Sequence, residues 1–227
     1  MKSSRPYVIC HMAPSIDGRI VTGHWDVSAS LTKDYERTAA TFDGDAWIIG
    51  RISMEPYAGK AKVPRRKGGE PIPRKDFIAR RDAESYAIAL DPSGKLTWTS
   101  SSIDEEHVIT VLTESVSDDY LAFLQSKGVS YVFGGKKNLN LARVLATLRK
   151  EFGIKTLLLE GGGKINGSFL AADLIDELSI LIAPVADGGM GTPALFDTKK
   201  PVARNLKLMS AETLKSGVVW VRYKVKR

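Results

Sequence analysis

The sequence predicts an α/β fold in which a largely parallel β-sheet is sandwiched between helices. Apolar runs of strand length recur along the chain, and helical patterns lie between many of them. This alternation is typical of parallel sheets, because parallel strands need a crossover connection and a helix usually supplies it. The 227 residues, 43% of them apolar, can bury a full core, so we expect a single domain over residues 1–227.

Eight apolar runs are expected to form the strands of this sheet, because each has strand length and is followed by a polar or glycine-containing segment. In chain order they cover residues 7–11, 46–50, 85–90, 108–112, 130–133, 156–159, 177–183 and 218–225. A long segment with little apolar periodicity joins the last two runs. These two could pair antiparallel at one side of the sheet, a common variation in such folds.

Helices are expected at four places between these strands. The first covers residues 32–42, with Thr32 as a plausible N-cap. The next two, at residues 118–126 and 139–152, repeat apolar side chains at helical spacing and so present one apolar face each. The fourth, at residues 165–172, follows the sixth strand.

Cysteine and histidine usage argues against a disulfide-bonded protein and against a metal site. The single cysteine, Cys10, lies in an apolar run, so no disulfide can form within the chain and we expect a packed thiol in a reducing cytoplasm. His11, His24 and His107 are scattered without metal-ligand spacing, so no metal site is expected. No window approaches the roughly 18 apolar residues of a membrane helix.

The net charge of +7 comes from one segment of the chain. Residues 60–81 carry nine Lys or Arg and two acidic residues, whereas the remaining charges balance. The segment is rich in Pro and Gly, so we expect a loop, inserted at about residues 58–82 of the domain. Three roles are open for it: a solvated insertion, a flap that gathers phosphate groups, or a nucleic-acid-binding surface.

The most informative motif is Leu159-Glu160-Gly161-Gly162-Gly163-Lys164, where an apolar strand runs through an acidic residue and three glycines into a helix. Such a loop presents bare backbone N–H groups at a helix N-terminus, which suits an anion such as a dinucleotide pyrophosphate. The motif is neither a Rossmann fingerprint nor a P-loop, because its glycines lack those spacings. Glu160 stands at the carboxyl end of the strand, where α/β folds place ligand-binding groups.

Two further loops follow expected strands. Residues 12–20 follow the first strand and contain Asp17-Gly18, which alone would indicate only a turn. Within residues 47–55, the second strand ends at Gly50-Arg51, and Ser53 follows two positions later. Glycine allows a ligand to approach the backbone, and an arginine with a hydroxyl could hold a phosphate.

Taken in this order, the motifs resemble the reductase domain of riboflavin biosynthesis, which belongs to the dihydrofolate-reductase-like superfamily. The matching segments are Ser15-Ile16-Asp17-Gly18-Arg19-Ile20, Gly50-Arg51-Ile52-Ser53, Glu160-Gly161-Gly162-Gly163, Asp176-Glu177-Leu178, Ile182-Ala183-Pro184 and Gly188-Gly189. The resemblance covers nearly the whole chain. It implies a three-layer sandwich with a mostly parallel central sheet and antiparallel C-terminal strands.

The resemblance also implies an activity and a set of site residues. The activity is NADPH-dependent reduction of 5-amino-6-(5-phosphoribosylamino)uracil, with hydride transfer to the sugar C1′ of a ring-opened imine. Glu160 would face the substrate, with Asp17 and Ser28 lining the same cleft, and either carboxylate could move a proton or only bind pyrimidine N–H groups. The cofactor would be bound by Ala13, Gly50, Arg51, Ser53, Gly162, Gly163, Lys164, Ile165 and Asn166.

Two departures from the family pattern matter. An Asp-Asp-Pro-like stretch that helps to hold the substrate's ribose phosphate is replaced here by residues 55–59 and the basic segment. Another arginine could take over this grip, or the enzyme could reduce another pterin-like or carbonyl substrate; the candidates are Arg65, Arg66, Arg74, Arg80 and Arg81. A zinc deaminase domain needs cysteine ligands that one cysteine cannot supply, so we expect a stand-alone reductase. Relatives are commonly dimers, so a homodimer is expected.

Overall fold

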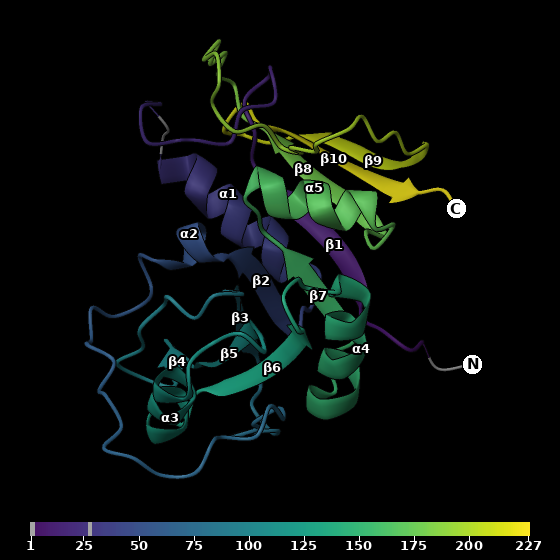
Figure 1. The fold of residues 1–227 in the computed structure, drawn as a ribbon. Helices are drawn as coiled ribbons and strands as arrows, with labels where there is room; N and C mark the ends of the chain where they lie inside the picture. Colours follow the sequence, from purple (N-terminus) through teal and green to yellow (C-terminus); the bar gives the residue numbers. More distant parts are fainter. Residues whose placement is uncertain (1–2, 27–28) are drawn as a thin grey trace. The chain divides into compact units, whose positions relative to one another are not determined.

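The computed structural model describes residues 3–26 and 29–227. Its contacts group into two compact units (Figure 1). The first unit is formed by Met1–Pro6 and Asp45–Lys155, and the second by Tyr7–Gly44 and Thr156–Arg227. The expectation of one functional reductase domain over the whole chain stays a prediction.

The first unit contains a parallel set of four strands. These are β2 (Ala46–Gly50), β3 (Tyr86–Leu90), β5 (Glu106–Thr113) and β6 (Ser130–Gly135). Strand β3 pairs with β2 on one side and β5 on the other, and β6 pairs with β5. The short strand β4 (Ser102–Ile103) pairs antiparallel with the start of β5. Parallel pairing places the carboxyl ends of the four longer strands at one edge.

Three helices belong to this unit. Helix α2 (Arg51–Met54) is a single turn directly after β2. Helix α3 (Asp118–Ser126) begins after the N-cap Ser117, whose hydroxyl accepts a hydrogen bond from the backbone N–H of Tyr120. Helix α4 (Leu141–Phe152) begins after the N-cap Asn140, whose side-chain oxygen accepts a hydrogen bond from the backbone N–H of Arg143. It ends at Gly153, which has the left-handed conformation.

The second unit places β1 (Tyr7–Met12) between β7 (Thr156–Leu159) and β8 (Glu177–Ile182), all parallel. Strand β10 (Val219–Val225) then pairs antiparallel with β8, and β9 (Leu206–Thr213) pairs antiparallel with β10. Helix α1 (Ala29–Ala40) packs Leu31 against Leu181 and Trp220, and helix α5 (Gly163–Ala171) lies in front of β8 in Figure 1. The predicted mixed sheet with antiparallel C-terminal strands is confirmed.

One prediction of local structure is wrong, and three short or exposed elements, among them helix α2, were not predicted. Helix α1 already includes Ala29 and Leu31, so Thr32 is not its N-cap; Leu31 lies in a buried cluster, and this packing outweighs the local cap signal. Strands β4 and β9 were not predicted. Nearly every residue of β9 is exposed, so this strand shows no alternation of apolar and polar residues.

Strand β1 buries two titratable side chains, and the expected packing of the Cys10 thiol is confirmed. The Cys10 thiol is fully buried, and burial together with the nearby Glu160 raises its pKa far above the usual value. The His11 ring is also fully buried, with Nδ1 2.9 Å from Ser179 Oγ and Nε2 3.2 Å from the carbonyl oxygen of Tyr35. Burial is the largest cause that lowers the pKa of His11 to about 4.

The His11 shift predicts how stability depends on pH. In the unfolded chain the imidazole has its ordinary pKa of about 6.5, so as pH falls the unfolded state takes up the proton first. Stability is therefore full above pH ~6.5 and decreases down to pH ~4, by about 3 kcal/mol from this group. Urea unfolding of the wild type and of His11→Gln between pH 4.5 and 7.5 should give a shallower pH slope for the variant; equal slopes would contradict the assignment.

Candidate active site

The turn from β7 into α5 is built around three glycines that follow Glu160. Gly161 has a φ of +100°, in the region that favours glycine. Gly162 is the extended N-cap of α5, and no side chain caps the helix there. Gly163, the first helical residue, has no room for a side chain, because a Cβ atom would lie 2.1 Å from the carbonyl oxygen of Ala194. The turn therefore carries no side chains at the start of α5, and Gly161 and Gly163 are themselves buried.

The loop that follows β8 crosses this turn and is hydrogen-bonded to it. The backbone N–H of Asp197 donates to the carbonyl oxygen of Gly163 at 3.0 Å, and Asn166 Nδ2 donates to the carbonyl oxygen of Leu195 at 3.0 Å. Asn166 is fully buried, and among the residues that the structure describes its Oδ1 atom has no hydrogen-bond partner. A buried acceptor without a donor is unusual and fits a site that a ligand completes.

The loop that follows β1 carries Asp17. Both of its carboxylate oxygens accept hydrogen bonds from the loop after β8, at 3.0 Å from the N–H groups of Asp187 and Gly188. The hydroxyl of Ser15 donates to the same carboxylate at 2.7 Å. These hydrogen bonds, the one from Asp187 first, hold the pKa of Asp17 far below its usual value. Asp17 thus holds two loops together as an ionised carboxylate.

Three loops at the carboxyl ends of β7, β1 and β8 therefore meet in the second unit. Gly161 lies against the side chain of Met12, and the N–H of Leu195 donates to the carbonyl oxygen of Gly18. These loops and the start of α5 carry eight of the predicted site residues: Ala13, Asp17, Glu160, Gly162, Gly163, Lys164, Ile165 and Asn166. Parallel strands of α/β proteins usually bind ligands at this edge.

The remaining predicted residues lie elsewhere. Gly50 ends β2 in the first unit, and Arg51 and Ser53 belong to the one-turn helix α2 that follows it. The guanidinium of Arg51 forms an ion pair with Glu55 four residues on, at the helix surface. Ser28 falls outside the described residues.

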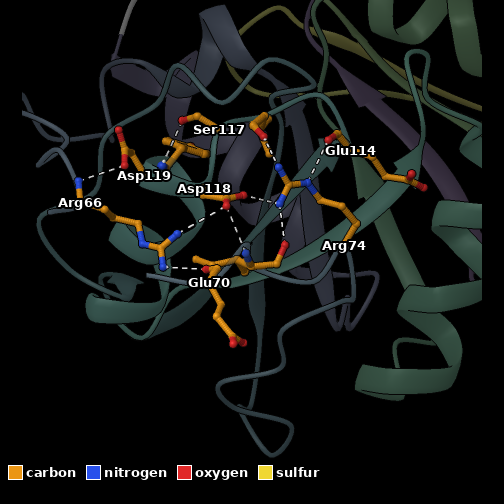
Figure 2. A network of polar contacts seen from close by, with 10 residues as sticks. Arg66, Glu70, Arg74, Glu114, Ser117, Asp118 and Asp119 are labelled. Carbon is orange, nitrogen blue, oxygen red and sulfur yellow. Dashed lines mark hydrogen bonds and ion pairs between the residues drawn. The ribbon is translucent and has the colours of Figure 1, made fainter. Parts of the chain in front are cut away.

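The basic segment 60–81, which belongs to the first unit, is irregular in structure. Hydrogen bonds and ion pairs bind it to the start of helix α3 (Figure 2). Asp118, at the start of α3, accepts hydrogen bonds from the N–H of Ile72 at 3.1 Å and from Arg74 at 2.6 Å, and it pairs with Arg66 at 3.4 Å. The hydrogen bond from Arg74 is the largest cause that holds the pKa of Asp118 below its usual value. Phe77 packs on the core and pairs with Tyr131 through a β-bridge. The segment is thus held against the unit by several contacts, and we call residues 60–81 the strap.

Several arginines of this strap are already paired with carboxylates. Arg66 and Arg74 bind Asp118, Arg81 pairs with Glu151 at 3.0 Å, and Arg80 pairs with its neighbour Asp82 at 3.6 Å. Of the five arginines considered for a phosphate grip, Arg65 is the one with no ion pair within the described part of the chain. The segment therefore offers fewer free charges than its composition indicates.

Two features are absent from residues 3–26 and 29–227. None of their helices is long and apolar enough to cross a membrane. In the same ranges, no three His, Cys, Asp or Glu side chains gather where they could hold a metal ion.

Comparisons with known proteins agree with the fold and the motifs. The family model described as RibD C-terminal domain matches residues 6–220. A 2,5-diamino-6-ribosylamino-4(3H)-pyrimidinone 5′-phosphate reductase of Methanothermobacter thermautotrophicus is 28% identical over 98% of this chain and 99% of that protein. A protein of the same name from Aquifex aeolicus is 30% identical over 84% of this chain and 82% of that protein. A solved pyrimidine reductase-like protein from Corynebacterium diphtheriae shares the fold, with a TM-score of 0.72, 18% identity, and 98% and 92% of the two chains covered.

Proposed function

Because this chain belongs to the RibD C-terminal domain family, and is therefore a pyrimidine reductase of riboflavin biosynthesis, we propose that it reduces a 6-ribosylaminopyrimidine 5′-phosphate with NADPH. NADPH supplies a hydride, which adds to the sugar C1′ of the ring-opened imine, because a closed glycosylamine offers no unsaturated carbon. The observation that carries this proposal is the match to a reductase of that class along 98% of the chain.

The residues of the second unit fit a dinucleotide cofactor. Helix α5 is nine residues long and starts at uncapped glycines, so its N–H groups and its dipole favour a pyrophosphate. The unpartnered Oδ1 of Asn166 suits a hydroxyl or amide N–H donor of the same ligand. We propose that Gly162, Gly163, Lys164, Ile165 and Asn166 bind the pyrophosphate, and that Ala13 lies against the nicotinamide.

Gly50, Arg51 and Ser53 are proposed to bind a phosphate of the cofactor. Gly50 ends β2 without a side chain that would block a ligand, and Arg51 and Ser53 provide a charge and a hydroxyl directly after it. A guanidinium of this kind suits the 2′-phosphate that distinguishes NADPH from NADH.

Glu160 is proposed to act on the substrate at the carboxyl end of β7. Addition of a hydride to C1′ requires a proton on the neighbouring nitrogen, and a carboxyl group could hold that proton. Asp17 is poorly suited to this step, because the hydrogen bonds from Asp187, Ser15 and Gly188 keep its carboxylate ionised. Glu160 could instead bind pyrimidine N–H groups.

Two pyrimidines are candidates, and they differ at ring position 2. The predicted substrate, 5-amino-6-(5-phosphoribosylamino)uracil, has an oxo group there, whereas the 2,5-diamino-pyrimidinone named for the two relatives has an amino group. The extent of the match to those relatives favours the diamino compound. An oxo group accepts a hydrogen bond and an amino group donates one, so a single site should strongly prefer one of them.

A spectroscopic assay tests this function. Protein is mixed with NADPH and each pyrimidine in turn, and the nicotinamide absorbance is followed. We expect NADPH oxidation with one of the two and a much lower kcat/KM with the other. Oxidation only with another pterin-like or carbonyl compound would reject the substrate class and keep a reductase, and no oxidation with any of them would reject the function.

A homodimer in the cytoplasm completes the proposal. Strand β9 stands at the edge of the order β8-β10-β9 and exposes Leu206, Leu208 and Met209, so a second copy could cover it. The lone, fully buried cysteine is consistent with a reducing compartment. Light scattering at micromolar concentration should give twice the chain mass of 24.8 kDa.

A further inference from the structure

The loops that follow β1 and β8 run side by side in the second unit. The backbone N–H of Ile16 donates to the carbonyl oxygen of Val185 at 2.8 Å, and that of Ile20 donates to Pro193 at 3.2 Å. The first loop, residues 13–26, has no helix or strand of its own and carries Ala13 and Asp17. Its path therefore depends on contacts with the second loop.

Two carboxylates tie these loops together crosswise. Asp17 of the first loop accepts hydrogen bonds from the N–H groups of Asp187 and Gly188 in the second. Asp187 in turn accepts a hydrogen bond from the Trp25 indole Nε1 at 2.6 Å, and its Oδ2 lies 2.8 Å from His24 Nε2. We call the five residues His24, Trp25, Asp17, Asp187 and Gly188 the clasp.

Asp187 is enclosed by its hydrogen-bond donors. Its side chain is 0% exposed, while that of His24 is 55% exposed. The second oxygen, Oδ1, accepts from the N–H of Gly189 at 2.9 Å. A carboxylate removed from water needs such donors, and the bond from Trp25 is the largest cause that lowers the pKa of Asp187. Asp187 therefore holds the far end of the first loop as a carboxylate.

We propose that Asp187 is a positioning residue that keeps the loop 13–26 closed before the pyrimidine binds. The proposal rests on the proposed function, which places Ala13 of this loop at the nicotinamide, and on the family resemblance, which places Asp17 in the substrate cleft. A loop that is already ordered loses less conformational entropy when its ligand binds, so the clasp increases affinity without touching the substrate. The Asp187 carboxylate contacts Trp25 and His24 of the first loop and Gly189 of its own loop, so it is not a catalytic residue.

The clasp can be opened without removing the core beside it. Trp25 also packs against a buried cluster that includes Leu31, Leu181 and Trp220, and none of these contacts involves the Asp187 carboxylate. The variant Asp187→Asn should therefore fold. A matched control is Asp173→Asn, because Asp173 is an aspartate of the same unit whose carboxylate pairs with Arg204 and Arg227 instead.

The kinetic test compares these two variants with the wild type. Asp187→Asn should lower kcat/KM for the pyrimidine about tenfold, mainly through KM, which corresponds to the loss of one charge-assisted hydrogen bond. The Kd for NADPH should change less than twofold, because Ala13 directly follows β1 and the hydrogen bond from the N–H of Ala183 to the carbonyl oxygen of Pro14 holds that end of the loop independently of Asp187. Asp173→Asn should match the wild type in both. An unchanged KM, or an equal loss in NADPH affinity, would overturn the proposal.

A spectroscopic test decides the proposal whichever pyrimidine is reduced. The fluorescence of Trp25 is obtained as the difference between each protein and its Trp25→Phe counterpart. Acrylamide should quench this difference more strongly in Asp187→Asn than in the wild type, because a neutral amide holds the indole less tightly than a carboxylate and leaves it more accessible. Equal quenching would overturn the clasp itself, whereas increased quenching in a protein that reduces no pyrimidine would reject only the proposed function.

A double-mutant cycle identifies the bond involved. Trp25→Phe keeps an aromatic ring and removes the N–H donor. Like Asp187→Asn, it should therefore raise the KM for the pyrimidine. In the double variant the two effects should be clearly less than multiplicative, because Trp25→Phe removes the hydrogen bond that Asp187→Asn weakens. Fully multiplicative effects would show that the two side chains act independently and would overturn the proposal.

Discussion

Replacing Glu160 with glutamine should reduce kcat for pyrimidine reduction by about 10²-fold or more. Glutamine has nearly the same shape, but it cannot hold or release a proton at neutral pH. The NADPH dissociation constant should change much less, because the glycines that follow Glu160, rather than its carboxylate, are proposed to bind the pyrophosphate. Steady-state kinetics and a fluorescence titration with NADPH measure the two quantities separately.

The same variant distinguishes the two roles that Glu160 could have. If it transfers the proton, the loss appears in kcat and one limb of the pH profile disappears. If it only binds pyrimidine N–H groups, the loss appears in KM and the profile keeps its shape. Glu212→Gln is a matched control on the exposed face of β9. Unchanged turnover in Glu160→Gln would remove Glu160 from the site.

Replacing Gly163 with alanine should disturb the turn at the start of α5. The added Cβ would lie 2.1 Å from the carbonyl oxygen of Ala194 and 2.7 Å from Asp197 Oδ2, so the crossing loop must move. Overpacking of this kind costs about 2 kcal/mol of stability. Because the same loop binds Asn166, we expect NADPH affinity to fall at least tenfold as well.

A second glycine provides the control for this experiment. Gly23 lies in the same unit, and a Cβ there would meet no atom within 4 Å. Gly23→Ala should therefore leave the urea midpoint and the NADPH dissociation constant near the wild-type values. Equal behaviour of the two variants would contradict the close crossing at Gly163.

Much of the fold could be predicted because its strands are buried continuously. Every residue of β3 is buried, so Tyr86–Leu90 reads as an apolar run. The exposed edge strand β9 could not be predicted, since its ladder to β10 is made by backbone groups that leave no pattern in the side chains.

The site was predictable only where its residues are neighbours in sequence. The glycine turn after Glu160 is local, and its strand and helix lie directly beside it. The exchange between Asp17 and Asp187 joins residues 170 positions apart, and a single sequence shows no such pairing. The run Asp187-Gly188-Gly189 was a visible signal, but its partner was not.

The strap shows the same limit for charge. Composition indicated a strongly basic loop, yet Arg66 and Arg74 are bound by Asp118, which follows them by more than 40 residues. The sequence could therefore count the charges of this segment but could not show which of them are already paired.

The most direct measurement of the central claim follows the hydride itself. NADPH that carries deuterium at the transferred position of nicotinamide C4 is incubated with the protein and the diamino or uracil substrate, and the pyrimidine product is examined by mass spectrometry and NMR. We predict one deuterium per product, located at C1′ of the ribityl chain. Unlabelled product, or label at any other carbon, would contradict the proposed reaction.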